Sequence, residues 1–188
     1  MSWPEFSKRS CRPFGHAVAV VVAGLLGIST GGCGFHPLYA TTEYGGANVS
    51  EAMKAVQIAT IPSRTGQRLR NELIFGTTGG GEPSAPIYRL DVALREGVRN
   101  ALVTQQGLPT SQILELDAEF RLVRIKDNQV VFKAYSSTQA AYNLTGVTGV
   151  TGSTYGDTRA VLDAENRAAR SLADDLKTRV AAFLSRPA

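Results

Sequence analysis

The chain has 188 residues, 43% of them hydrophobic and 19% charged, a balance typical of one globular domain rather than of a disordered or fibrous protein. Its formal net charge of +4 is mild, and the charges are scattered rather than gathered in blocks. The sequence therefore excludes a dedicated basic segment, and we expect no nucleic-acid partner.

Residues 1–32 have the layout of a lipoprotein signal peptide that is cleaved. Lys8, Arg9 and Arg12 precede the apolar run "AVAVVVAGLLGI" (17–28), and small residues follow it. A membrane-spanning helix needs about 20 apolar residues, and this run is shorter, which favours a cleaved signal over an uncleaved anchor.

Cys33 follows the small residues directly. Small residues before a cysteine at the end of an apolar run resemble the lipobox of bacterial lipoproteins, although Thr30 stands where such boxes usually carry Leu. The resemblance implies cleavage before Cys33 and its acylation as the first residue of the mature protein. Because one acyl chain anchors a protein only marginally, we expect more than one chain.

Few residues remain for covalent or metal chemistry in the mature chain. Cys11 and His16 leave with the signal, so that only an acylated Cys33 and His36 are left. The sequence thus predicts no disulfide, no catalytic residues and no metal site. The lipid on Cys33 is the only non-protein group expected, and no cofactor is.

The mature chain opens with an expected lipidated N-terminus and surface tether, 33–54, followed by a single domain, 55–188. The stretch "KAVQIATIP" (54–62) predicts a short strand. Leu69 and Leu73, four residues apart, predict a helix over 63–75 that Ser63 or Thr65 caps, although Gly66 near its start obscures the boundary.

A glycine-rich loop (76–86) separates this helix from three predicted strands. "IYRLDVALREGV" (87–98) alternates between apolar and charged residues, and 113–144 predicts a hairpin that turns near Asp127 and Asn128. One face of the first hairpin strand is expected to be buried: Leu116, Ala118, Phe120 and Leu122.

The chain ends in a Thr/Gly loop (145–157) and a long predicted helix (158–187), capped by Asp157 and ended by Pro187. An apolar stripe at steps of three and four runs along this helix: Val161, Ala164, Ala168, Leu172, Leu176, Val180, Phe183 and Leu184.

The order strand, helix, three strands, helix predicts an α+β fold, a two-layer sandwich in which two helices pack on one face of an approximately four-stranded sheet. The other face carries arginines and acids, and we expect it to meet water or a polar partner surface.

Four stretches in this order carry a specific resemblance: "CGFHPLY", "RLRNEL", "AAYNL" and "AENRAARSLADDLKTRVAAFL". Together they resemble the lipopolysaccharide-assembly lipoprotein family, LptE, in its alphaproteobacterial form, over essentially the whole mature chain. The Thr/Gly loop up to Thr158 departs from the family, whose loop is shorter.

The resemblance implies a non-enzymatic role in the outer membrane. Such proteins hold a lipid anchor that faces the periplasm, and they plug and help assemble the LptD-type β-barrel that inserts lipopolysaccharide into the outer leaflet. Gly34, rather than Asp, resembles the outer-membrane sorting signal. A polar barrel lumen suits a plug with charged outer surfaces.

The resemblance also implies contact with lipopolysaccharide, whose phosphates favour Arg and Lys. The predicted hairpin offers Arg121, Arg124, Lys126 and Lys133.

Two rival interpretations remain. A lipoprotein that serves as auxiliary subunit of a different envelope transport complex predicts the same anchor and a similar core. A secreted hydrolase would have to use strand carboxylates, but these alternate with arginines as on a solvated sheet face: Asp91, Glu96, Glu115 and Asp117.

Overall fold

The structure is a computed structural model that describes residues 48–83, 85–145 and 153–185, all within one compact unit, Leu38–Ala188. Cys33 and Pro187 lie outside the described residues. The elements in chain order are α2 (Val49–Lys54), β1 (Val56–Ile58), α3 (Arg64–Thr78), β2 (Tyr88–Val103), β3 (Pro109–Arg124), β4 (Gln129–Asn143) and α4 (Ser153–Leu184).

The four strands form one mixed sheet in the order β1-β2-β3-β4. β2, β3 and β4 are successive antiparallel partners, with Leu122 opposite Leu90 on one side and Phe132 on the other. β1 pairs in parallel with the start of β2, Val56 opposite Tyr88, and α3 provides the crossover that a parallel pair needs.

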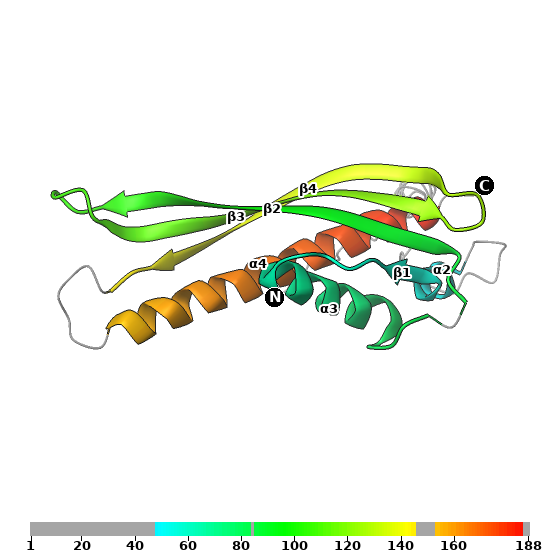
Figure 1. Ribbon diagram of the computed structural model, residues 1–188, viewed down its shortest axis with the longest axis horizontal. Helices are drawn as coiled ribbons and strands as arrows, with labels where there is room; N and C mark the ends of the chain where they lie inside the picture. The colour runs from blue at the N-terminus through cyan, green and yellow to red at the C-terminus, as the bar shows by residue number, and fades with distance from the viewer. Residues whose placement is uncertain (1–47, 84, 146–152, 186–188) are drawn as a thin grey trace, which may run out of the picture. The chain divides into compact units, whose positions relative to one another are not determined.

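The sheet is one layer, and α3 and α4 form a second layer beneath it (Figure 1). The predicted two-layer α+β fold is confirmed. The four β3 residues predicted to share a buried face are each 0% exposed, and they meet α4 residues that are also buried: Ala164, Ala168, Leu172, Leu176 and Val180. The remaining stripe residues, Val161, Phe183 and Leu184, pack against this core and are partly buried.

Three aromatic rings join the layers near the β3–β4 turn. Phe132 of β4 lies 5.9 Å from Phe120, edge to face, and 4.8 Å from Phe183 of α4, stacked. Such pairs add to the stabilisation that burial of their area provides.

Part of the expected tether is a helix. Residues 49–54 form α2, which begins after Asn48, whose side chain accepts a hydrogen bond from the Glu51 N–H at 3.3 Å. Val49 and Met53 are 6% and 3% exposed and belong to the core. The packed part of the chain therefore begins before Lys54, where the sequence interpretation expected a surface segment.

α3 begins as predicted after Ser63, whose hydroxyl accepts from the Gly66 N–H at 3.0 Å. It runs three residues beyond the predicted end and stops at Gly79, which has φ +78°. A left-handed conformation of this kind favours glycine, and it ends the helix.

The hairpin strands and α4 are longer than predicted. β2 continues to Val103 and β3 starts at Pro109, so that their hairpin extends past the first turn of α4 at the left of Figure 1. α4 starts at Ser153, and Asp157 is therefore inside the helix instead of capping it. Its carboxylate accepts from the N–H and the hydroxyl of Thr145, at 2.6 and 3.0 Å.

None of the helices in the described ranges has the length and apolar character needed to cross a membrane.

Candidate functional site

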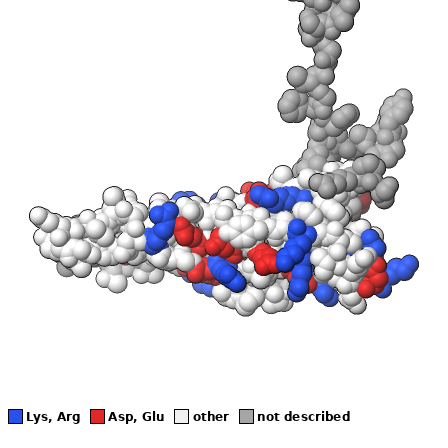
Figure 2. Space-filling model, turned by 90° about the horizontal axis from the view of Figure 1, so that it is seen from above, with Lys and Arg blue, Asp and Glu red and all other residues white. Residues whose placement is uncertain are grey.

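The sheet face that the helices leave uncovered, called the open face below, is polar. Its residues alternate with the buried ones along three strands. It consists of Arg89, Asp91, Ala93, Arg95, Gly97 and Arg99 of β2, Ile113, Glu115, Asp117, Glu119 and Arg121 of β3, and Lys133, Tyr135, Ser137 and Gln139 of β4. Figure 2 looks onto this side, where cations and anions are interleaved.

Most charges on the open face are paired, either within a strand or across neighbouring strands. Asp91 accepts from Arg89 Nε at 2.9 Å, and Arg121 Nε lies 3.6 Å from its other oxygen. Lys133 Nζ lies 2.5 Å from Glu119 Oε1. The face is thus close to neutral at short range, which limits its attraction for an anion.

Hydrogen bonds on the open face shift the pKa of two ionisable side chains. The hydrogen bond from Lys133 lowers the pKa of the Glu119 carboxyl, and the hydrogen bond to Asp117 raises the pKa of the Tyr135 hydroxyl. Arg99 bridges Glu115 and Gln139, at 2.6 and 3.3 Å. These contacts fix the polar side chains of three adjacent strands relative to one another.

Two shallow hollows meet on the open face beside Ala93 and Glu119. Their volumes are about 300 and 310 Å³. Arg121 borders the first, and Arg95 and Tyr135 border the second. Shallow polar hollows on a broad sheet face suit a macromolecular surface better than an enclosed small molecule.

The four cations predicted to contact lipopolysaccharide divide into two pairs. Arg121 and Lys133 are opposite each other in the β3–β4 register, on the open face, and both have a carboxylate neighbour. Arg124 ends β3 and pairs with Asp127 at 3.2 Å, while Lys126 in the turn makes no hydrogen bond or ion pair with another described residue. The hairpin turn therefore offers the less neutralised pair.

Sequence interpretation missed the contributions of Arg99, Tyr135 and Gln139 to this face. The signal was present in β4, where Lys133, Tyr135 and Gln139 fall on the same side of a strand with period two. Their partners could not be assigned before the register was known.

The carboxylates that a hydrolase would need are each engaged by a neighbour. Glu96 accepts from the hydroxyls of Ser63 and Thr65 at 2.6 and 3.1 Å. The other three bind arginine or tyrosine as described above: Asp91, Glu115 and Asp117. Each therefore has a structural role at its position.

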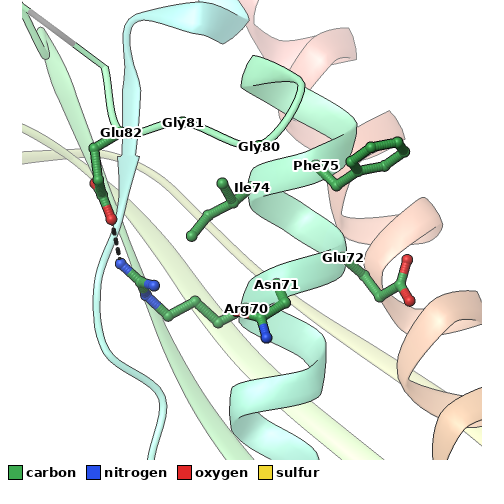
Figure 3. Close-up of a pocket in the computed structure, with 8 residues that line it drawn as sticks. All are labelled: Arg70, Asn71, Glu72, Ile74, Phe75, Gly80, Gly81 and Glu82. Carbon is green, nitrogen blue, oxygen red and sulfur yellow. Dashed lines mark hydrogen bonds and ion pairs between the residues drawn. The ribbon is translucent and has the colours of Figure 1, made fainter.

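A pocket of about 630 Å³ lies at the end of α3 (Figure 3), and none of the four predicted cations lines it. Arg70 and Glu82 point toward one another across it and pair at 2.5 Å, whereas Phe75 points away. Arg70 also donates to the Ile58 carbonyl at 3.3 Å. Arg70 thus connects the loop after α3, through Glu82, to the end of β1.

No group of three or more His, Cys, Asp or Glu within the described ranges is arranged to hold a metal ion.

Residues 53–180 match the family model LptE, described as lipopolysaccharide-assembly. The match covers more than half of the chain. The chain belongs to the LptE family. LptE-like proteins do not depend on a cofactor. No curated protein matches the sequence.

One of three similar solved structures, the first below, shares the fold of this LptE-family chain. A putative lipoprotein from Caulobacter crescentus CB15 is 19% identical, with a TM-score of 0.60 over 75% of this chain and 98% of that one. The rare lipoprotein B from Shewanella oneidensis is 10% identical, with a TM-score of 0.48 over 68% and 92% of the two chains. A minor lipoprotein from Acinetobacter baumannii is 16% identical, with a TM-score of 0.45 over 68% and 91%.

Proposed function

We propose that this LptE-family chain is an outer-membrane lipoprotein, acylated at Cys33 and facing the periplasm, that plugs an LptD-type β-barrel and helps it assemble. The observation that carries the proposal is the open face. A sheet covered by helices on one side and by mostly paired charges on the other can lie against the polar wall of a barrel lumen and bury little unpaired charge.

The chain divides accordingly into a cleaved signal (1–32), an acylated tether and a folded domain. Because Val49 and Met53 are buried, the tether of the proposed mature protein is limited to the residues before α2. The proposal contains no catalytic step.

The partner is tested by purifying the full chain, through a tag after Ala188, from membranes extracted gently with detergent. Mass spectrometry then identifies the stoichiometric partner and the N-terminal residue. We expect a one-to-one complex with a large outer-membrane barrel and a chain that starts at acylated Cys33. Recovery of an inner-membrane transport complex instead would favour an auxiliary subunit of another machine, and an unmodified Cys33 would refute the lipid anchor.

We also propose that the chain contacts lipopolysaccharide through the predicted cations, and that the turn pair contributes more than the strand pair. Lys126 is exposed and makes no ion pair with a described residue, and Arg124 is 40% exposed beside one carboxylate. Arg121 and Lys133 must first leave Asp91 and Glu119, which costs part of the gain from a phosphate contact.

The matched test compares two double variants in capture of lipopolysaccharide by the purified full chain. Arg124→Ser with Lys126→Ser is expected to weaken capture about tenfold, which corresponds to the loss of one or two charge-assisted contacts. Arg121→Ser with Lys133→Ser is the control, because it also removes two positive charges. If the wild type and the turn variant capture lipopolysaccharide equally, Arg124 and Lys126 are removed from the proposed site. If the control variant loses more capture than the turn variant, the contact is assigned to the open face.

A further inference from the structure

The sheet carries no charged side chain at one end of the described structure. The hairpin segment from Asn100 to Leu114 contains no Asp, Glu, Lys, Arg or His, and neither does the adjoining part of β4 from Ala134 to Thr145. The segments are neighbours in the sheet, because Gln112 lies opposite both Asn100 and Tyr142. In Figure 2 this end is white, while charges occupy the rest of the face.

Exposed apolar side chains gather at the same end. Nine large hydrophobic side chains are exposed among the described residues, and three of them belong to residues 100–110, called the hairpin tip below. Their exposed fractions are 51–64%: Leu102 64%, Val103 56% and Leu108 51%. These residues lie outside the core, so folding of the domain does not explain their apolar character.

The hairpin tip satisfies much of its own backbone. The β2–β3 ladder continues to Val103 opposite Pro109, and the Thr104 N–H donates to the Leu108 carbonyl at 2.8 Å. The Leu108 N–H donates to Thr104 Oγ1 at 3.1 Å, and the Gly107 N–H to the Thr104 carbonyl at 2.9 Å. Unsatisfied backbone groups are the main cost of entering hydrocarbon, and a closed turn reduces that cost.

The start of α4 adds side chains suited to a lipid headgroup layer. It lies at this end because Thr145, which follows β4, is bonded to Asp157. Tyr155 is 74% exposed, and Arg159 is exposed and makes no ion pair with another described residue. Tyrosine and arginine combine an apolar body with a polar end, which places them at the boundary between acyl chains and headgroups.

We propose that the hairpin tip inserts Leu102, Val103 and Leu108 into the acyl-chain layer of a lipid surface, with Arg159 beside the lipid phosphates. The absence of charge on the tip matches the hydrocarbon, and a guanidinium that no described carboxylate neutralises matches an anionic headgroup. This role goes beyond the proposed barrel partnership and uses neither the open face nor the β3–β4 turn.

The test places a fluorescent reporter at the tip of the full chain. Leu108→Trp is compared with Val130→Trp, which is 48% exposed and sits next to the other turn of the same sheet. Trp3, the only tryptophan, is replaced by Phe in both variants. The probes are vesicles of phosphatidylcholine and phosphatidylglycerol with or without bromine on the acyl chains.

With Leu108→Trp we expect emission at shorter wavelength and quenching by the brominated chains, and with Val130→Trp neither change. Adding Leu102→Gln to Leu108→Trp is expected to lower insertion about tenfold, because an exposed leucine is a large part of the inserted area. Arg159→Gln is expected to remove the preference for phosphatidylglycerol over pure phosphatidylcholine vesicles.

Absence of quenching at Leu108→Trp, or equal quenching at both positions, would refute lipid insertion and leave a protein surface as the occupant of the tip. Leu102→Trp repeats the measurement if Leu108→Trp does not fold, as judged by circular dichroism. The assay contains neither a barrel nor lipopolysaccharide, so its failure is distinguishable from failure of the proposed function.

Discussion

Gly66 is predicted to resist the substitution that usually stabilises a helix. It lies in the first turn of α3 and is buried, and an added Cβ would lie 2.7 Å from Ile61 Cγ2 and 3.1 Å from the Ile61 carbonyl oxygen. Ile61 is 0% exposed, so core side chains surround it. The variant Gly66→Ala therefore sets helix propensity against overpacking.

The magnitude follows from these two opposing effects. Replacing glycine by alanine in a helix stabilises it by at most about 1 kcal/mol. Overpacking a buried site costs about 1–3 kcal/mol, which here exceeds the gain because backbone atoms of Ile61 are among the close neighbours. The expected net result for Gly66→Ala is a loss of about 1 kcal/mol of unfolding free energy, or a fall of about 2–4 °C in Tm.

Gly76 in the same helix provides the control. An added Cβ there would lie 3.2 Å from Lys177 Cδ, in a flexible side chain that can rotate away. Gly76→Ala is therefore expected to raise stability by up to about 1 kcal/mol. Urea unfolding followed by circular dichroism measures both variants. Equal changes of the same sign would refute the packing argument.

Two further predictions concern the packing of the sheet and α4. Phe120→Ala is expected to cost about 3–5 kcal/mol in urea unfolding, because the side chain is 0% exposed and contacts Phe132. A loss below 1 kcal/mol would contradict its central place in the core. Burial raises the pKa of the Asp175 carboxyl, but hydrogen bonds from Ser136 and Arg179 outweigh it, so that this pKa is lowered overall. The resulting stability is present above about pH 4 and is lost as pH falls through the folded-state pKa. Because the Asp175 side chain is 41% exposed, solvent screens these contacts, and Asp175→Asn should cost only about 0.5 kcal/mol of unfolding free energy at pH 7. The difference in unfolding free energy between the variant and the wild type should narrow in acid; a difference independent of pH would contradict this.

The sequence predicted those elements whose two faces meet different surroundings. Leu116 to Leu122 alternate because one face of β3 is buried against α4 and the other meets solvent. The continuation of β2 toward the hairpin tip has no such alternation, because both faces of this strand are exposed there and backbone pairing with β3 holds it. The six residues of α2 are too few to show a helical period.

The misplaced start of α4 has a non-local cause. Asp157 before an apolar stripe is typical of a helix cap, but its carboxylate binds Thr145 at the end of β4 instead. The separation of the predicted cations is also non-local, because the β3–β4 register decides that Lys133 faces Arg121 and pairs with Glu119. A single sequence gives the turn near Asn128 but does not reveal which side chains become neighbours.

The position of α4 in the chain affects the order in which the domain can fold during synthesis. β2, β3 and β4 form two consecutive hairpins of local contacts, which assemble quickly. Their apolar face, including Leu116, Phe120 and Leu122, is covered mainly by α4, which follows all four strands in the chain. Until α4 has been synthesised, the nascent protein exposes a broad apolar sheet face, so a chain truncated after β4 would aggregate rather than persist as a smaller domain. Folding of this domain is thus completed only after the strands have waited for a helix that lies C-terminal to all of them.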